Sequence, residues 1–288
     1  MKLCLACEKQ FNGGSWECPS CGYSPGIGSG HWIFAPEMTE RRHGFDPAHF
    51  GILAKIEETH WWFLSRRALI LWVLRRYFSP LKNFFEIGCG TGFILSGIQE
   101  AIPDLSLSGS DLFIEGFAYA GKRLSRASLF QMDARRIPFR EEFDVIGAFD
   151  VLEHVEEDEE VLSQLFKAVK RGGGIIVTVP QHPFLWSTQD RYSFHKRRYT
   201  RKELIRKVEK AGFTNLWWTS FVSLLMPMMF LSRLARSRKD EFDVFEEFRI
   251  ERSLNRVLLN IMSAEFLMIR KGLSLPVGGS LLLVAIKV

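Results

Sequence analysis

The chain has 288 residues, 47% hydrophobic and 25% charged, with a formal net charge of +5. This length allows one sizeable α/β domain with additions, and the composition excludes a disordered or low-complexity protein. The modest positive charge permits an acidic partner but does not by itself indicate nucleic acid. No secretory signal is visible, and the longest apolar stretch is shorter than the roughly 20 residues that cross a bilayer, so we expect a cytoplasmic chain.

The N-terminal segment holds four of the five cysteines, in two C-x-x-C pairs: Cys4, Cys7, Cys18 and Cys21. Two residues between thiolates let both face one ion, and two such pairs complete a tetrahedral Zn²⁺ shell with no open position. Disulfides are the alternative, but a chain without a secretory signal should be reduced. We therefore predict a structural zinc ribbon over residues 1–30, closed by a flexible linker at 24–31.

Residues 31–80 are expected to form a helical segment. Apolar and aromatic residues recur at helical spacing from Asp46 to Phe78, which predicts one long helix that ends before Pro80. Strands are then expected at 83–88, 105–111, 127–132, 143–149, 174–180, 212–220 and 280–288. Helices are expected between them at 92–101, 114–125, 157–171 and 200–211.

This alternation predicts an α/β fold, a Rossmann-like seven-stranded, mostly parallel sheet with helices on both faces. We expect residues 81–220 and 278–288 to form this core. Residues 221–277 interrupt the pattern and are expected to form an inserted helical cap. Its apolar run and basic cluster at 221–239 could contact a membrane surface as an interfacial helix, or could be a lid, a core helix or a dimer helix.

The stretch "FFEIGCGTGF" places glycines at alternate positions 88, 90 and 92, after a predicted strand. A dinucleotide turn needs the spacing G-x-G-x-x-G, whereas this turn has G-x-G-x-G. Glu86 is poorly placed for a phosphate but well placed for a cation such as an amino group. Asp111 ends the second strand, where such folds bind a ribose diol, and Asp133 ends the third and could accept from an adenine amino group. These requirements describe S-adenosylmethionine.

At these motifs the chain resembles the class I S-adenosylmethionine-dependent methyltransferases, and in particular their small-molecule, ubiquinone-pathway O-methyltransferase-like members. The matching segments are "FFEIGCGTG", "GSDLF", "QMDARRIPF", "FDVIGAFDVLEHVEED" and "KRGGGIIVTVP". The resemblance implies that Glu86 and the turn of Gly88, Cys89, Gly90 and Gly92 hold the methionine end and ribose of the cofactor. It implies that Asp111 binds the ribose hydroxyls. Leu112, Asp133 and Ala134 would contact the adenine, and Phe149 and Asp150 would border the methyl group. Arg66 or Arg67, in a helix that closes over the cofactor in similar enzymes, could pair with the methionine carboxylate.

The acceptor side is expected in the segment after the fifth strand, "PQHPFLWSTQDRYSFHKRRYTRKEL", and in "DVLEHV". His195 is predicted as a base or substrate contact, with His154 and Tyr192 as further catalytic candidates. A segment similar to "DVLEHV" binds a divalent cation in some relatives, and carboxylates with imidazole suit such an ion. Asp150, Glu153 and His154 are therefore predicted as a cation site.

The expected activity is methyl transfer to a small, hydrophobic or lipid-like metabolite. The first alternative is an RNA base methyltransferase that uses the zinc ribbon for docking, although the ribbon offers no arginine and no clear phosphate-binding stripe. The second is a non-catalytic module that binds the cofactor or docks a protein. The sequence does not indicate the acceptor atom or the oligomeric state.

Overall fold

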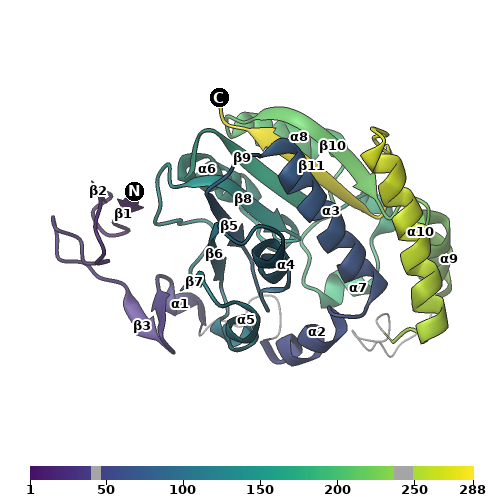
Figure 1. Cartoon of the computed structure of the whole chain (residues 1–288), viewed down its shortest axis with the longest axis horizontal. Coiled ribbons are helices and arrows are strands. Elements are labelled where there is room, and N and C mark those ends of the chain that lie inside the picture. Colours follow the sequence, from purple (N-terminus) through teal and green to yellow (C-terminus); the bar gives the residue numbers. More distant parts are fainter. Residues whose placement is uncertain (40–46, 237–248) are drawn as a thin grey trace.

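The computed structural model describes residues 1–39, 47–236 and 249–288. A nine-stranded sheet forms its centre, in the order β10-β11-β9-β8-β5-β6-β7-β4-β3 (Figure 1). Neighbours from β9 to β4 run parallel, and β10, β11 and β3 are antiparallel additions at the two edges. The strands are β3 (Gly26–Gly28), β4 (His31–Ile33), β5 (Asn83–Ile87), β6 (Ser106–Asp111), β7 (Ala127–Gln131), β8 (Phe143–Phe149), β9 (Val169–Pro180), β10 (Thr214–Phe221) and β11 (Ser280–Ile286). The predicted mostly parallel Rossmann-like sheet is confirmed.

Helices cover both faces of the sheet, and two short strands, β1 (Lys2–Leu3) and β2 (Gln10–Phe11), pair apart from it in the ribbon. The α-helices are α1 (Pro36–Thr39), α2 (Phe50–Ile56), α3 (Trp61–Tyr77), α4 (Phe93–Ala101), α5 (Phe117–Arg123), α6 (Asp158–Ala168), α7 (Thr188–Tyr192), α8 (Arg201–Lys210), α9 (Met226–Arg236) and α10 (Arg252–Arg270). Single 3₁₀ turns are η1 (Pro47–His49), η2 (Ile114–Gly116), η3 (Leu152–His154) and η4 (Pro183–Leu185).

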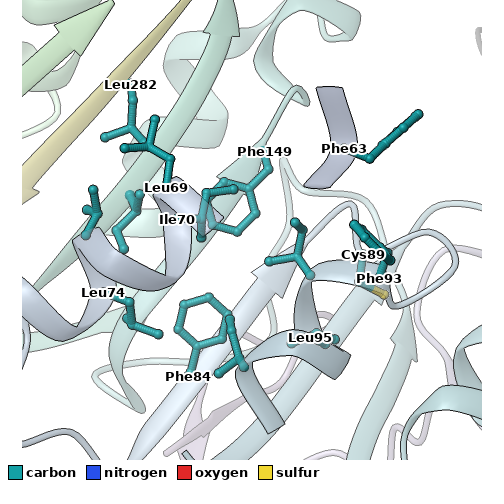
Figure 2. Close-up of a cluster of buried hydrophobic side chains, with 14 of the residues drawn as sticks. Phe63, Leu69, Ile70, Leu74, Phe84, Cys89, Phe93, Leu95, Phe149 and Leu282 are labelled. Atoms are coloured by element: carbon teal, nitrogen blue, oxygen red, sulfur yellow. The ribbon is translucent and has the colours of Figure 1, made fainter. Parts of the chain in front are cut away.

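The side chains of adjacent residues in the central strands are buried on opposite faces of the sheet, because side chains alternate along a strand. Phe84 packs with Ile70 and Leu74 of α3 and Leu95 of α4 in one core (Figure 2). Phe85 packs in a second core on the other face, against residues of α6 and α8. Strands buried on both faces read as nearly continuous apolar runs, which is why the sequence located them.

Residues 24–31 differ from the predicted flexible linker. They contribute to a hairpin of β3 and β4, and β4 pairs in parallel with β7, with Trp32 opposite Phe130 and Ile33 opposite Gln131. The sheet therefore has nine strands where the sequence predicted seven. Three-residue strands carry too little periodicity to be recognised from sequence. Here β4 is stabilised by pairing with the edge strand β7, and β3 by pairing with β4.

The single helix predicted from Asp46 to Phe78 is wrong. The structure has two helices, α2 and α3, and Asp46 lies outside the described residues. His60 ends the break as the N-cap of α3, where its Nδ1 accepts from the backbone N–H of Trp62 at 3.3 Å. Asn255 of α10 stabilises the same end, since its side chain accepts from the Trp61 N–H and donates to the Thr59 carbonyl, both at 2.9 Å.

The segment before the last strand forms α9 and α10, and α10 packs on α3 through the buried Leu258, Met262 and Ile269. Helix α9 exposes Met228, Phe230 and Leu231 within the segment predicted to contact a membrane. Residues 237–239 of that segment lie outside the described part of the chain. Within the described ranges, no helix combines the length and the apolar character needed to cross a membrane.

Candidate functional site

The glycine turn links β5 to α4 at the carboxyl edge of the sheet. Gly88, Gly90 and Gly92 have φ angles of +72°, +48° and +73°, in the left-handed region that favours glycine. A Cβ on Gly88 would lie 2.5 Å from Cγ2 of Val151, so this position also excludes a side chain sterically. The turn therefore exposes its backbone where the neighbouring strands end.

Asp111, the last residue of β6, fixes the turn from the side. Its Oδ2 accepts from the Gly90 N–H at 2.9 Å, and its Oδ1 accepts from the Phe113 N–H at 3.0 Å. Burial raises the pKa of Asp111 to about 6, although both backbone donors oppose that shift. The carboxylate keeps lone pairs for two further donors, as a ribose diol requires.

A cavity of about 340 Å³ lies beside this turn, at the carboxyl ends of β5, β6, β7 and β8. The sequence-predicted residues that line it are Arg66, Glu86, Gly88, Cys89, Gly90, Asp111, Leu112, Asp133, Ala134, Phe149, Asp150 and His154. Gly92 does not line it and instead forms the N-cap of α4. Acids from four successive parallel strands thus converge on one space, as expected at this edge of an α/β sheet.

Glu86 is the most buried of these acids and has one unpartnered oxygen, Oε2. Burial raises its pKa well above the ordinary value, and the nearby Arg66 opposes that shift. Arg66 forms an ion pair with Asp150 and lies over the Trp62 ring at 4.5 Å. Among the described lining residues, Arg66 is the only lysine or arginine, so the cavity is strongly acidic.

Asp133 is less free than the sequence suggested. The guanidinium of Arg135 binds both of its oxygens, with Nε 3.0 Å from Oδ1 and Nη2 2.7 Å from Oδ2. Any ligand at this end of the cavity would share the Asp133 carboxylate with Arg135.

Helix α2 and its C-cap residue supply lining residues that the sequence did not predict, namely Phe50 and Leu53 of the helix and Glu57 at the C-cap. Glu57 binds the Thr91 hydroxyl at 2.5 Å and the Arg123 guanidinium at 2.8 Å, which ties α2 to the glycine turn and to α5. The sequence pattern gave no signal for this, because it predicted α2 as part of one continuous helix. The aromatic lining residues Trp62 and Phe63 come from the start of α3.

The predicted catalytic residues are placed differently from one another. His154 lines the cavity. The centroid of the His195 ring lies 4.8 Å from that of the His154 ring, and the two rings meet edge to face. Tyr192 is exposed on α7, outside the cavity lining. Burial and the neighbouring charge of His195 lower the pKa of His154 to about 3, so its ring is neutral at physiological pH.

Two of the three predicted cation ligands, Glu153 and His154, lie together, and the third, Asp150, is paired elsewhere. Asp150 is paired with Arg66 and accepts from the Thr178 hydroxyl at 3.3 Å. Glu153 is fully buried with both carboxylate oxygens unpartnered. Ligand atoms of Glu153, His154 and His195 all lie within 4.8 Å of one another, so the structure brings His195 to the place that the sequence assigned to Asp150.

Comparison with known proteins agrees with this geometry. Residues 63–216, more than half of the chain, match the methyltransferase-domain family. The chain belongs to this family. The match begins with the cavity-lining end of α3 and includes the glycine turn and all four acidic strand ends.

Two curated relatives share the methyltransferase region. The chain is 24% identical over 163 residues to a Mycolicibacterium smegmatis protein named "Probable S-adenosylmethionine-dependent methyltransferase", covering 55% of this chain and 61% of that one. It is 26% identical over 159 residues to phosphoethanolamine N-methyltransferase 2 of Caenorhabditis elegans, covering 50% of this chain and 36% of that one. The chain thus spans less than two thirds of either relative.

Two of the solved structures that share the fold illustrate the similarity. One is a chain of the complex between the Haloferax volcanii Trm112 methyltransferase activator and a methyltransferase, with a TM-score of 0.57 and 16% identity over 84% of this chain and 96% of that one. The other is Haemonchus contortus phosphoethanolamine N-methyltransferase 2 in complex with S-adenosyl-L-methionine, with a TM-score of 0.57 and 16% identity over 90% and 61%. At such identities the likeness shows the methyltransferase fold alone.

The four N-terminal cysteines lie outside the residues matched to the methyltransferase family and form a separate cluster. The Cys4 and Cys21 sulfurs are 3.6 Å apart, and those of Cys7 and Cys18 are 3.7 Å apart. Zn–S bonds of about 2.3 Å in a tetrahedron place sulfurs roughly 3.8 Å apart, whereas a disulfide needs about 2.05 Å. The donor set and its spacing therefore fit a four-coordinate Zn²⁺.

Proposed function

We propose that this chain is an S-adenosylmethionine-dependent methyltransferase that acts on a small molecule. The observation that carries the proposal is the cavity lining, which contains five carboxylates and one guanidinium. Glu57, Asp133 and Asp150 are paired with arginines, whereas Glu86 and Asp111, at the glycine turn, have no cationic partner among the ion pairs of the described residues. Such a surface disfavours the phosphates of a nucleotide and favours a cationic adenosine compound. The left-handed glycine turn supplies backbone next to it, as the cofactor's amino-acid end would need.

The cofactor residues predicted from the sequence have a consistent arrangement under this proposal. Glu86 and the glycine turn would receive the methionine ammonium, and Asp111 the ribose hydroxyls. Leu112, Asp133 and Ala134 would border the adenine, and Phe149 and Asp150 the methyl group. Arg66 would pair with the methionine carboxylate while it also contacts Asp150.

Calorimetry with S-adenosylhomocysteine tests the proposal. We expect one site per chain, with an affinity at least about 100-fold above that for ATP or NAD⁺, because juxtaposed like charges cost several kcal/mol. Binding of ATP or NAD⁺ in preference to S-adenosylhomocysteine would overturn it. Release of S-adenosylhomocysteine from labelled cofactor in the presence of a metabolite extract would separate the enzyme from a non-catalytic module.

The acceptor side favours a small molecule over RNA. The cavity lining also includes the aromatic and aliphatic groups of Phe50, Leu53 and Trp62, which suits a partly hydrophobic metabolite. In the ribbon, the Lys2 ammonium binds the carbonyls of residues 13–15 and so is held within the ribbon. The RNA alternative would require salt-dependent RNA binding, which a filter-binding titration measures.

Cofactor binding should depend on pH through Asp111. Its pKa of about 6 means that the carboxylate, which can accept from both ribose hydroxyls, is lost as the pH falls through 6. We expect the affinity for S-adenosylhomocysteine to decrease about fourfold between pH 7.5 and pH 5.5, the factor by which the ionised fraction falls. Protonation of Glu86, whose pKa is also raised, acts in the same direction. Calorimetry across this range checks it, and an affinity that rises toward pH 5.5 would contradict it.

We propose further that Glu153, His154 and His195 hold a divalent cation beside the acceptor. An unpartnered buried carboxylate is costly, and a cation would offset that cost. Metal-binding histidines usually donate their second ring nitrogen to a carboxylate or carbonyl. Here the His195 Nδ1 lies 2.9 Å from Oδ1 of Asp190. Two imidazoles and one carboxylate suit Zn²⁺ or a similar first-row ion, whose open positions could hold an acceptor oxygen.

A further inference from the structure

Gln131, the last residue of β7, connects the N-terminal ribbon segment to the cavity wall. Its side chain is fully buried and hydrogen-bonded at both ends. The Oε1 atom accepts from the Ala35 N–H at 3.0 Å, and Nε2 donates to the Ala35 carbonyl at 2.9 Å. The same Nε2 donates to the carbonyl of Leu112, at 3.1 Å. Since Leu112 lines the cavity, one side chain joins the chain after β4 to that wall.

Backbone pairing strengthens this connection. Strand β4 pairs with the end of β7, and the Phe34 N–H donates to the Gln131 carbonyl at 2.8 Å. On the other side of Gln131, the Met132 N–H donates to the carbonyl of Asp111 at 3.1 Å. The β3–β4 hairpin therefore supports the ends of β6 and β7, where Asp111 and Asp133 enter the cavity.

A second connection begins at the cysteine cluster. Cys4 lies between Leu3, whose N–H donates to the Pro138 carbonyl at 3.0 Å, and Leu5, whose carbonyl accepts from Arg136 at 3.0 Å. These contacts hold the loop that follows Asp133 and Ala134. Cys4, of the first cysteine pair, is thus flanked on both sides by residues hydrogen-bonded to the loop that completes the cavity.

Trp16, between the two cysteine pairs, packs the ribbon onto this wall. Its buried ring lies 4.7 Å from Phe34, 6.0 Å from Phe130 and 5.4 Å from Phe139, each edge to face. A segment this short has little apolar core of its own, so a metal bound by the four cysteines would supply most of its folding energy. Loss of the metal should therefore loosen Trp16, the hairpin and the contacts of Gln131 together.

We propose that Gln131 is a positioning residue for the cofactor and that metal binding by the four cysteines strengthens cofactor binding through it. This inference rests on the proposed function of the cavity. The bound metal orders the ribbon, the ordered hairpin fixes Gln131, and Gln131 fixes the Leu112 wall beside Asp111. A pre-formed wall binds more tightly because less ordering is left to the binding step.

The experiment measures S-adenosylhomocysteine affinity for the full chain, zinc-loaded and chelator-treated, in wild type and in Gln131→Met. Methionine keeps the volume and removes the three side-chain hydrogen bonds. Thr219→Val is the matched control. Thr219 lies in β10, outside the cavity lining, and its buried hydroxyl donates to the Ser220 carbonyl and accepts from the Leu275 N–H. Thermal unfolding and hydrogen exchange of residues 111–113 are followed on the same samples.

We expect roughly tenfold weaker binding on zinc removal from wild type and on Gln131→Met, with Thr219→Val unchanged. Zinc removal should weaken binding less in Gln131→Met than in wild type, because the Gln131 connection is already broken there and only the contacts of Leu3 and Leu5 remain to be lost. Equal affinities across zinc-loaded, chelated and Gln131→Met samples would overturn the proposal, and so would a Thr219→Val loss that matches Gln131→Met. If zinc-loaded wild type does not bind S-adenosylhomocysteine, the proposed function fails. Hydrogen exchange of residues 111–113 then tests the connection from the cysteine cluster to the cavity wall separately. Faster exchange without zinc supports that connection, and unchanged exchange overturns it.

Discussion

Replacing Asp111 with asparagine is expected to weaken S-adenosylhomocysteine binding roughly 100-fold. The carboxylate already accepts from the N–H groups of Gly90 and Phe113, and under the proposed function it would also accept from two ribose hydroxyls. An asparagine has one acceptor oxygen, so its amide nitrogen would face either a backbone donor or a ribose hydroxyl. Each hydrogen bond to a charged group contributes about 1.5–3 kcal/mol, and the loss of one or two accounts for the factor. Calorimetry at pH 7.5 measures it.

The control for this variant is Asp104→Asn, which removes an exposed carboxylate from the loop before β6. We expect wild-type affinity for that variant, since Asp104 lies outside the cavity lining. The Asp111→Asn variant should also lose the pH dependence that the wild-type carboxylate produces between pH 7.5 and pH 5.5. An affinity within about threefold of wild type in a folded Asp111→Asn chain would remove Asp111 from the ribose site.

The sheet and the acidic strand ends were predictable because their signals are local. β5, β8 and β9 contain short runs of buried apolar residues, whereas β6 buries Leu107, Gly109 and Ser110; Asp111 ends β6, and Asp150 directly follows β8. Carboxyl ends of parallel strands meet at one edge. Knowledge of the strands therefore implied that these side chains share a cavity, as the structure shows.

The remaining parts of the site depend on contacts between distant segments. Glu57 is held at the cavity by its bond to Arg123, 66 residues away in sequence. No local sequence pattern predicts a pair so far apart. The pairing of β4 with β7 joins residues almost a hundred positions apart. Asp150 was predicted as a cation ligand because a segment similar to "DVLEHV" binds a cation in some relatives, whereas this fold pairs Asp150 with Arg66 and brings in His195 from beyond β9.

The largest expected effect on metal binding is that of Glu153→Gln, which should weaken cation binding at Glu153, His154 and His195 more than about 100-fold. Removal of a hydrogen-bond partner of a metal ligand lowers metal affinity 10–100-fold, and Glu153→Gln removes the one charged ligand itself. Titration of the metal-stripped chain with Co²⁺ separates the two proposed sites. Cobalt bound by the four cysteines gives an intense thiolate charge-transfer band, and cobalt bound by imidazole and carboxylate does not.

Wild type should therefore take up two Co²⁺ ions per chain by equilibrium dialysis, only one of them with the charge-transfer band. Glu153→Gln and His195→Ala should each keep the band and lose the second ion. Glu156→Gln, which changes an exposed carboxylate three residues further along, should bind two. A wild-type chain that binds one ion, or a Glu153→Gln chain that still binds two, would rule out the Glu153 site. In that case His195, oriented by Asp190, would act on the acceptor without a metal, and Glu153 would carry a buried proton in keeping with its raised pKa.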